Sequence, residues 1–382
     1  MFLAKSSAQS WLLNGNTGTD PSTNFIGTKD KKSLVFRTSN LERMRINAAG
    51  SVGVGINHPV QKLDVNGNIN LGKGFSLYAE NHPVLRVDSA KANTFLGNGT
   101  APRISGSFCT AVGYQALFSN TSGSWNTGLG YQALMSNTTG FDNVAVGYIA
   151  LNTNSSANGN TAIGNYALLL NNGNYNTATG TGALLSNNNG TNNVANGRFA
   201  LYDNSAGSFN TAIGTEALSS NTVSYNTATG YRALYLNISG INNTANGLQA
   251  LYSNSAGSSN TAFGINALYS STGNYNTAVG DYALFNTTTA WGNTAIGDIA
   301  GASYHNGYYN TFIGAEADAT AADIFNSTAL GRATHVTASS QVRIGNSFVG
   351  SIGGYANWTN ISDGRVKKNI KKMFRVYRSS TN

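Results

Sequence analysis

The sequence has little of three things on which many folds depend: cysteine, proline and charge. Of its 382 residues 10% are charged, four are proline, and Cys109 is the single cysteine. One cysteine excludes a disulfide framework and any zinc site built from several cysteines of one chain. Four prolines without a Gly-x-y period exclude collagen. No stretch reaches the roughly 18 apolar residues that a membrane helix needs, so we expect no membrane span.

The formal net charge of +8 comes from the two ends of the chain. Residues 1–103 contain 12 Lys and Arg against 6 Asp and Glu, residues 104–333 contain 3 against 8, and residues 334–382 contain 8 against 1. A nucleic-acid groove needs cations clustered along its path, which the long middle does not have. The charge distribution therefore argues against a nucleic-acid partner.

What the sequence does contain is a glycine-centred repeat. Among its 45 glycines, fourteen follow one another at gaps of 16 or 17 residues. The pattern around each is Asn-Thr-Ala-x-Gly-x-x-Ala-Leu-x-x-Asn, as in residues 160–171. The fourteen repeat glycines are Gly113, Gly130, Gly147, Gly164, Gly180, Gly197, Gly214, Gly230, Gly247, Gly264, Gly280, Gly297, Gly314 and Gly331.

The length and composition of this repeat predict a parallel β-solenoid. A 17-residue unit is too short for a pair of helices or a propeller blade, and glycine and asparagine in every copy disfavour helix. One coil per repeat, with two short strands and two turns, stacks at about 4.8 Å, so fourteen coils make a rod of roughly 65 Å. We therefore expect an all-β fold, a solenoid of about fourteen coils with short β segments at both ends.

Each repeated position has an expected role in the coil. Glycine and asparagine are expected to provide the positive φ of the corners, stacked asparagines to bridge their amides along the axis, and alanines to let neighbouring backbones approach closely. Two apolar columns are expected to form the buried layer. The residue before each glycine gives the first: Val112, Leu129, Val146, Ile163, Ile213, Phe263, Val279, Ile296, Ile313 and Leu330. The leucine four residues after the glycine gives the second, from Leu117 to Leu284.

A longer period of 50 residues is superimposed on the short one. It relates Trp125, Tyr175, Tyr225, Tyr275 and Phe325. One interpretation, which we prefer, is duplication of a three-coil block in which these rings have a packing role. The other is an aromatic contact on every third coil, about 14 Å apart, that faces sugar or a partner strand.

The Asn-Thr-Ala-Ile-Gly and Ala-Leu-x-x-Asn elements resemble the head repeats of YadA-like trimeric adhesins and their longer versions in phage tail fibres and bacterial surface proteins. The resemblance covers about 60% of the chain, residues 104–333. It implies a left-handed β-roll with three chains side by side. The expected partner is therefore the chain itself, as a homotrimer.

The segment before the repeats is expected to form strands and a linker. Residues 33–37 and 41–47 alternate as strands do, and residues 50–67 resemble a glycine-rich linker of phage and bacterial fibre proteins. No helix follows these glycines, which argues against a dinucleotide site. Residues 1–9 are too short for a full signal peptide. The stub of such a peptide, which implies export, and an ordinary frayed terminus both stay open.

The segment after the repeats, from residue 341 to residue 370, resembles the beginning of the endosialidase-type intramolecular chaperone, a self-cleaving peptidase domain that trimerises fibres. The resemblance implies that Ser362 lies at the cleavage point with Lys367 as its dyad partner, since an uncharged lysine accepts a serine proton. The apolar helices expected after Lys372 are missing, so we expect no cleavage and prefer a solvated basic tail. The expected divisions are residues 1–103, 104–333, a β connector at 334–361, and the truncated chaperone at 362–382.

The rod has one concentration of carboxylates. Asp281 and Asp298 follow the repeat glycine in adjacent coils, with Glu316 and Asp318 one coil further. Stacked carboxylates repel one another, so solvated surface is preferred over a weak calcium site or a glycoside-hydrolase pair. Cys109 is expected to pack, and no cofactor is expected. The histidines have no partner at metal spacing: His58, His82, His305 and His335.

Together these features predict a non-enzymatic fibre protein, secreted or carried on a virion, located outside the cell, at a cell surface or in a tail fibre. Its rod is expected to space and present an end that binds a host or cell-surface glycan or a protein receptor. One rival is a carbohydrate-degrading tailspike, which needs Asp281, Asp298 and Glu316 in a cleft. The other is an ice-binding solenoid, although Val144 and Val194 interrupt its threonine column.

Overall fold

The computed structural model describes residues 17–70, 76–79 and 82–353 of the chain. These residues form an all-β structure without a helix, so none of them belongs to a helix that is long and apolar enough to cross a membrane. The chain divides into two compact units after residue 75. Each unit is described by itself.

The first unit contains a four-stranded sheet in the order β1 (Leu34–Thr38), β2 (Leu41–Ile46), β3 (Val52–Val54) and β4 (Leu63–Val65). β1 and β2 form an antiparallel hairpin in which Ser39 and Asn40 both have positive φ, 49° and 59°. Two such residues are what a type I′ hairpin turn requires. β3 pairs antiparallel with β2 and parallel with β4. The strands predicted from alternation are confirmed.

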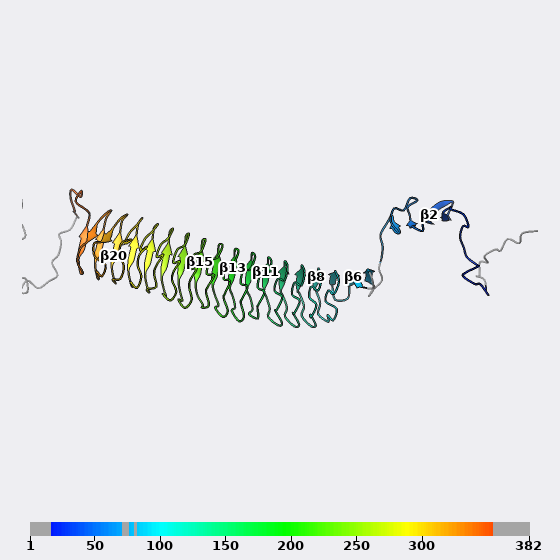
Figure 1. Cartoon of the computed structure of the whole chain (residues 1–382), viewed down its shortest axis with the longest axis horizontal. Helices are drawn as coiled ribbons and strands as arrows, with labels where there is room; N and C mark the ends of the chain where they lie inside the picture. The colour runs from blue at the N-terminus through cyan, green and yellow to red at the C-terminus, as the bar shows by residue number, and fades with distance from the viewer. Residues whose placement is uncertain (1–16, 71–75, 80–81, 354–382) are drawn as a thin grey trace, which may run out of the picture. The chain divides into compact units, whose positions relative to one another are not determined.

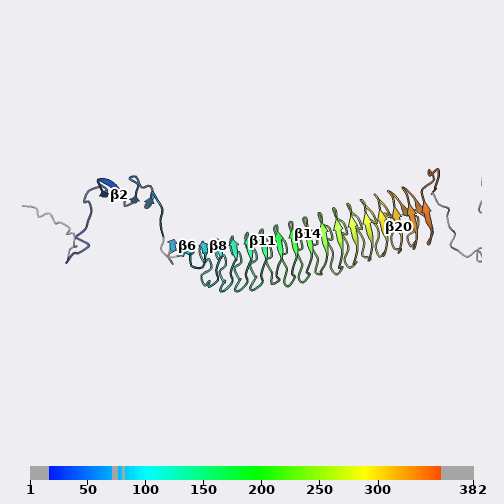
Figure 2. The same cartoon turned by 180° about the vertical axis from the view of Figure 1, so that it is seen from behind.

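The second unit begins with antiparallel strands and continues as a parallel solenoid. β5 (Ser76–Ala79), β6 (His82–Asp88) and β7 (Asn93–Leu96) pair antiparallel in chain order. From β7 onward each strand pairs in parallel with the strand of the next coil. Figure 1 shows the coils following one another from β6 past β20, and Figure 2 shows the same stack from behind. The predicted parallel β-solenoid is confirmed.

Fifteen three-residue strands continue the ladder within the described residues, and a two-stranded pair lies beside its last coils. The pair is β21 (Asp318–Ala319) with β23 (His335–Val336). The three-residue strands are β8 (Thr110–Val112), β9 (Thr127–Leu129), β10 (Val144–Val146), β11 (Thr161–Ile163), β12 (Thr177–Thr179), β13 (Val194–Asn196), β14 (Thr211–Ile213), β15 (Thr227–Thr229), β16 (Thr244–Asn246), β17 (Thr261–Phe263), β18 (Thr277–Val279), β19 (Thr294–Ile296), β20 (Thr311–Ile313), β22 (Thr328–Leu330) and β24 (Val342–Ile344).

The coil differs from the predicted one in having one strand rather than two. The rest of each repeat is a chain of turns, yet its backbone still bonds to the next coil, as where Leu117 N donates to Ala133 O at 3.0 Å. The ladder also begins before residue 104, at β7, and continues to β24. Parallel pairing uses backbone groups, so a segment that departs from the repeat sequence can extend the ladder by one strand just as a regular repeat does.

The repeat glycine is required by both backbone conformation and space. Gly164 has φ of +134°, and a Cβ there would lie 2.6 Å from the carbonyl oxygen of Gly180 in the next coil. Such a contact is far inside van der Waals distance, and side chains disfavour that φ. The same two conditions hold along the glycine column, for example at Gly214 and Gly247.

The interior is filled by the leucine column and by two columns of alanine, all of which are fully buried from coil to coil. The leucines also hold a corner, because Leu134 and Leu168 have φ of +53° and +50°. This left-handed conformation costs about 1–2 kcal/mol per residue, and burial of the side chain offsets it by about 1.5–3 kcal/mol. The asparagine before each strand, such as Asn126, has no positive φ, so the predicted corner role of asparagine was wrong there.

Two ladders of buried asparagines run through the coils. In the first, Asn143 N donates to Asn126 Oδ1 and Asn160 N donates to Asn143 Oδ1, each at 3.0 Å, while Asn143 Nδ2 donates to Ala157 O at 2.9 Å. In the second, Asn137 Nδ2 donates to Asn120 Oδ1 at 2.6 Å. The predicted stacking of asparagine amides is confirmed. The asparagine side chains also form hydrogen bonds with backbone N–H and C=O groups that the short strands do not pair.

Candidate functional site

The strands of the solenoid carry an outward-facing apolar column. Each strand from β8 to β20 and β22 has its central residue inward, an alanine in most coils, and its first and third residues outward, as in β11. The aliphatic residue before the glycine is consequently exposed: Ile163 by 42%, Ile213 by 44% and Ile296 by 42%. The prediction that this column joins the buried layer was wrong. The thin coil has one interior, which the leucines and alanines already fill.

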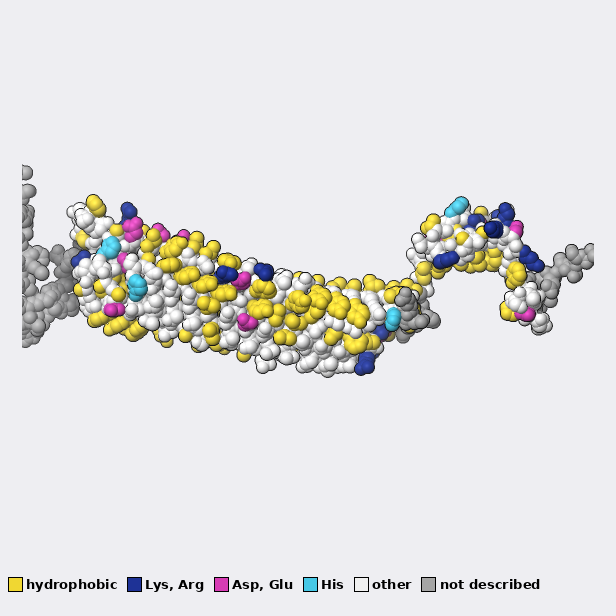
Figure 3. Space-filling model, viewed as in Figure 1, with side chains coloured by type: hydrophobic (Ala, Val, Ile, Leu, Met, Phe, Trp, Pro, Cys, Tyr) yellow, Lys and Arg dark blue, Asp and Glu magenta, His cyan; other side chains and the backbone are white. Residues whose placement is uncertain are grey.

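We call the first and third residues of strands β8 to β20 and β22 the outer strand face. It contains no charged residue, and most of its third positions are aliphatic. Thr179, Asn196, Thr229 and Asn246 are the polar exceptions among them. Figure 3 shows one side of the rod, with hydrophobic side chains along its length and few charged ones. The third-position column is therefore continuously apolar from β8 to β11 and again from β17 to β20 and β22, and exposed apolar surface of this kind is typical of a face that meets another molecule.

The aromatic residues of the 50-residue period are exposed. Trp125, Tyr175, Tyr225 and Tyr275 occupy one coil position with φ of 56°, 59°, 66° and 59°, and between 56% and 67% of each is exposed. Phe325 does not share that position, because it lies one residue earlier relative to its glycine, and it stacks on Tyr308 at 5.1 Å. Trp125 stacks on Phe108 at 5.9 Å and Tyr225 stacks on Phe209 at 5.4 Å, in each case a ring of the preceding coil, which agrees with the preferred packing role.

The predicted carboxylates lie on the surface as expected. Asp281 and Asp298 are exposed, Asp281 Oδ1 accepts a hydrogen bond from Ile265 N at 2.8 Å, and Glu316 lies 3.7 Å from Arg332. Asp318 differs, because it is buried and accepts from Ser303 N at 2.9 Å. Burial raises the pKa of the Asp318 carboxyl. In the described part of the chain no three or more His, Cys, Asp or Glu side chains gather closely enough to hold a metal.

Cys109 takes the place of an asparagine in the first ladder. It is fully buried, its N–H donates to Asn93 Oδ1 at 2.8 Å, and its Sγ lies 3.5 Å from Gly123 O. Burial raises the pKa of the Cys109 thiol, which keeps it protonated and agrees with the predicted packing role. Ser362 and Lys367, the dyad implied by resemblance, lie outside the described residues.

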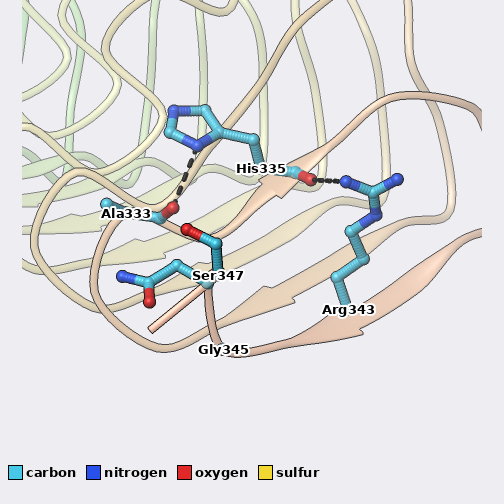
Figure 4. A pocket seen from close by; sticks show the side chains of 6 residues that line it. Ala333, His335, Arg343, Gly345 and Ser347 are labelled. Atoms are coloured by element: carbon cyan, nitrogen blue, oxygen red, sulfur yellow. Dashed lines mark hydrogen bonds between the residues drawn. The ribbon is translucent and has the colours of Figure 1, made fainter. Parts of the chain in front are cut away.

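A polar hollow of about 330 Å³ lies at the last coils of the ladder, beside His335 and Arg343. Figure 4 shows Arg343 reaching the backbone of His335, whose oxygen accepts from Arg343 Nη1 at 3.0 Å. His335 Nδ1 lies 3.0 Å from Ala333 O, and Arg343 Nη2 donates to Thr337 Oγ1 at 3.2 Å. His335 Nδ1 and the Arg343 guanidinium are therefore already hydrogen-bonded to neighbouring backbone and hydroxyl groups.

A second hollow, of about 300 Å³, lies midway along the rod. Aromatic side chains form much of its lining, and two carboxylates contribute to it. Phe199 and Tyr202 meet edge to face, with ring centroids 5.2 Å apart. The lining residues come from three successive turn segments and none from a strand: Phe199, Tyr202, Asp203, Glu216, Ser219, Ser220 and Tyr235. We call this site the mid-rod hollow.

The charges around the mid-rod hollow are not equally balanced. Glu216 forms an ion pair with Arg232 at 2.6 Å, whereas Asp203 has no ion-pair partner among the described residues. Partial burial raises the pKa of the Asp203 carboxyl. The mid-rod hollow was not predicted from the sequence. Its signal is the column five residues after the repeat glycine, where aromatic residues recur.

Comparison with known protein families finds no family model that matches this chain, and comparison with curated proteins finds no significant match. The function is therefore argued from the solenoid, its outer strand face and the mid-rod hollow.

Proposed function

We propose that the protein is a non-enzymatic structural fibre whose solenoid rod spaces and presents a receptor-binding end. In this proposal three chains associate through their outer strand faces. The observation that carries the proposal is the outer strand face itself, which is uncharged, carries an exposed and mostly apolar third-position column beside a threonine column, and is not covered by its own chain. The resemblance of the repeats to trimeric adhesins and tail fibres adds the number of chains.

Physical chemistry supports association along the rod. Most coils bury one leucine and small alanines, which is a modest interior, and ten of the fourteen strands of the outer strand face have an apolar third residue that is not buried. Burial of apolar surface stabilises by about 25 cal/mol per Å², and this gain recurs at each coil whose third strand residue is apolar. A bundle of chains thereby adds to the contacts between successive coils that hold a solenoid together.

The location and partners follow from this class of protein. A fibre of this kind acts outside the cell, at a cell surface or on a virion, and its end contacts a surface glycan or a protein receptor. In the same proposal Ser362 and Lys367 are an inactive remnant of a self-cleaving chaperone. The proposal gives Asp281 and Asp298 no enzymatic role: both are exposed, and Asp281 Oδ1 accepts a hydrogen bond from Ile265 N.

Sedimentation velocity of the full chain tests the proposal. A homotrimer has a mass of about 120 kDa, three times the 39.9 kDa of one chain. Crosslinking at low protein concentration provides an independent measurement of the number of chains. A monomer that stays folded at micromolar concentration contradicts the proposal.

The outer strand face also supports a second candidate, binding to ice. A flat, uncharged sheet face with a threonine column beside an aliphatic column suits an ordered water surface, and the structure places these two columns side by side. A thermal-hysteresis assay separates the candidates. If the wild-type chain shows thermal hysteresis and Thr227→Lys abolishes it, ice binding is supported. If the wild-type chain shows no thermal hysteresis, ice binding is eliminated.

A further inference from the structure

An aromatic ladder runs along the rod and ends at the mid-rod hollow. The residue five positions after the repeat glycine is aromatic in four consecutive coils, and the rings stack at 5.3, 5.1 and 5.3 Å. In chain order these are Tyr235, Tyr252, Tyr269 and Phe285. Tyr252 stacks on one side of the Tyr235 ring, and the preceding coil has no aromatic residue at this position, so the ladder ends at Tyr235.

The mid-rod hollow lies where one coil has no aromatic residue at this position of the ladder. The coil before Tyr235 has Ser219 at the same position, and the coil before that has Tyr202. Coils are about 4.8 Å apart, so Tyr202 and Tyr235 are separated by about two steps, or roughly 10 Å. The small Ser219 side chain leaves open the space that a ring occupies elsewhere in the column. This space between Tyr202 and Tyr235, which we call the slot of the mid-rod hollow, therefore has room for one ring of a ligand.

The polar groups of the slot suit a ligand with many hydroxyl groups. Asp203 has acceptor oxygens without an ion-pair partner, and Ser220 provides a hydroxyl that donates and accepts. The guanidinium of Arg232 lies 5.3 Å from the centre of the Tyr235 ring, but its charge is neutralised by Glu216. The guanidinium of Arg198 lies 4.4 Å from the centre of the Phe199 ring but does not line the hollow, so the charge that a ligand in the slot meets directly is the Asp203 carboxylate, which disfavours an acidic ligand.

We propose that the mid-rod hollow binds one pyranose ring of an uncharged glycan between Tyr202 and Tyr235. The aromatic side chains contact the apolar C–H face of the sugar, and Asp203 accepts hydrogen bonds from its hydroxyls. A pocket with aromatic walls and a few placed polar groups is the usual form of a small-ligand site. The site lies on the turns rather than on the outer strand face, so it does not depend on association into a trimer.

Isothermal titration of the full chain with defined hexasaccharides tests this site. The probes are cellohexaose, maltohexaose and N-acetylchitohexaose, which are uncharged, and hexagalacturonate, which is acidic. We expect at least one uncharged probe to bind with one site per chain and the acidic probe to bind at least about tenfold more weakly, a difference of about 1.4 kcal/mol. Failure of all three uncharged probes, or equal binding of the acidic one, overturns the proposal.

A ring-filling variant tests the slot itself. Ser219→Tyr supplies the missing rung, so we expect it to weaken binding at least tenfold while the thermal midpoint stays equal or rises. Asn152→Tyr is the matched control, because it adds the same ring at the same repeat position of a remote coil and leaves binding unchanged. Binding by Ser219→Tyr at wild-type strength overturns the site.

A second variant keeps the shape of the slot. Asp203→Asn retains the volume of the side chain and removes its charge and one acceptor, so we expect weaker binding of uncharged probes and less discrimination against hexagalacturonate. Unchanged binding of both overturns the role of Asp203. Sedimentation of the same samples separates this inference from the fibre proposal, since a binding monomer contradicts only the trimer and a trimer without binding contradicts only the glycan site.

Discussion

At the residue scale, a coil of 16 or 17 residues closes because glycine and leucine hold its backbone at positive φ for different reasons. The repeat glycine is needed where the next coil leaves no room for a Cβ. Leucine accepts the left-handed conformation because its side chain is fully buried there. Replacing either residue therefore has a different physical cost.

Gly214→Ala is expected to lower the free energy of unfolding by roughly 3 kcal/mol or more, because it combines strain with a steric overlap. Gly214 has φ of +128°, and a Cβ would lie 2.6 Å from Gly230 O. Gly128→Ala is the control, since Gly128 stands where other coils have a buried alanine. Gly128 has no positive φ and the new Cβ would lie 3.2 Å from Ala133 O, so the substitution is expected to change the free energy of unfolding by at most about 1 kcal/mol. Urea unfolding measures both, and equal effects contradict the argument.

Asn243→Ala tests the first asparagine ladder. Asn243 Oδ1 accepts from Asn260 N at 3.0 Å, and its Nδ2 donates to Gly257 O at 2.8 Å. Truncation leaves the buried Asn260 N without its acceptor, which costs about 1–3 kcal/mol for the unsatisfied group, whereas Gly257 O keeps the hydrogen bond that Asn254 Nδ2 donates at 2.8 Å. The exposed Asn188 supplies the control, and Asn188→Ala is expected to be near neutral in the same unfolding assay. A neutral Asn243→Ala contradicts the structural role of the ladder.

Asp318 is expected to make stability depend on pH. Burial raises its folded-state pKa above the ordinary value of 3.8, so the folded state favours the protonated carboxyl. Its contribution to stability is complete below the unfolded-state pKa and is lost as the pH rises through the folded-state pKa. The stability of Asp318→Asn relative to wild type should therefore rise between about pH 3 and pH 7. Unfolding at several pH values measures this, with exposed Asp298→Asn as control, and a constant difference contradicts it.

At the scale of the element, a three-residue strand has an inward alanine and two outward side chains. The strand is stable because it pairs with a coil on either side, and its outward residues are free to serve a different purpose from folding. Lysine substitutions on that face consequently separate association from folding.

Ile163→Lys combined with Ile213→Lys is expected to dissociate the proposed trimer and leave the circular dichroism spectrum unchanged. Both side chains are more than 40% exposed in the single chain, so lysine creates no buried charge there, whereas an interface would bury it. Ser156→Lys combined with Ser205→Lys places the same charges at exposed turn positions. Sedimentation velocity compares the two double variants. Dissociation of the control as well would show that charge alone, rather than the outer strand face, is responsible.

Periodicity allowed the solenoid and the asparagine ladders to be predicted from sequence, because both repeat with the coil. Hydrophobicity did not reveal that Ile163 faces outward, since a thin coil has apolar residues on both sides of its strand. The left-handed leucines were missed because residue type gives no hint of that φ. Phe325 was misplaced because the last gap has 17 rather than 16 residues. The role of Ser219 could not be predicted from the sequence, because it depends on the space between the Tyr202 and Tyr235 rings, which only the stacked coils show.

At the scale of the whole molecule, the second unit behaves as a one-dimensional stack in which each coil contacts its two neighbours. The stability of such a stack is approximately a sum over coils and the interfaces between them. Removing whole coils should then shorten the rod without changing its structure. Removing part of a coil should instead misalign the columns and destabilise the rod.

Deleting residues 131–180 removes 50 residues, or three whole coils, and joins Gly130 to Thr181. We expect the product to fold with the same circular dichroism spectrum per residue and a rod about 14 Å shorter, because every glycine, leucine and asparagine column stays aligned across the junction. Deleting residues 131–172 instead joins Gly130 to Gly173, which places the second half of a coil directly after its glycine. That variant breaks both asparagine ladders and should unfold at lower urea concentration although it removes fewer residues. Small-angle scattering and urea unfolding compare the two, and greater stability of the longer, misaligned chain would contradict a stack held by aligned columns.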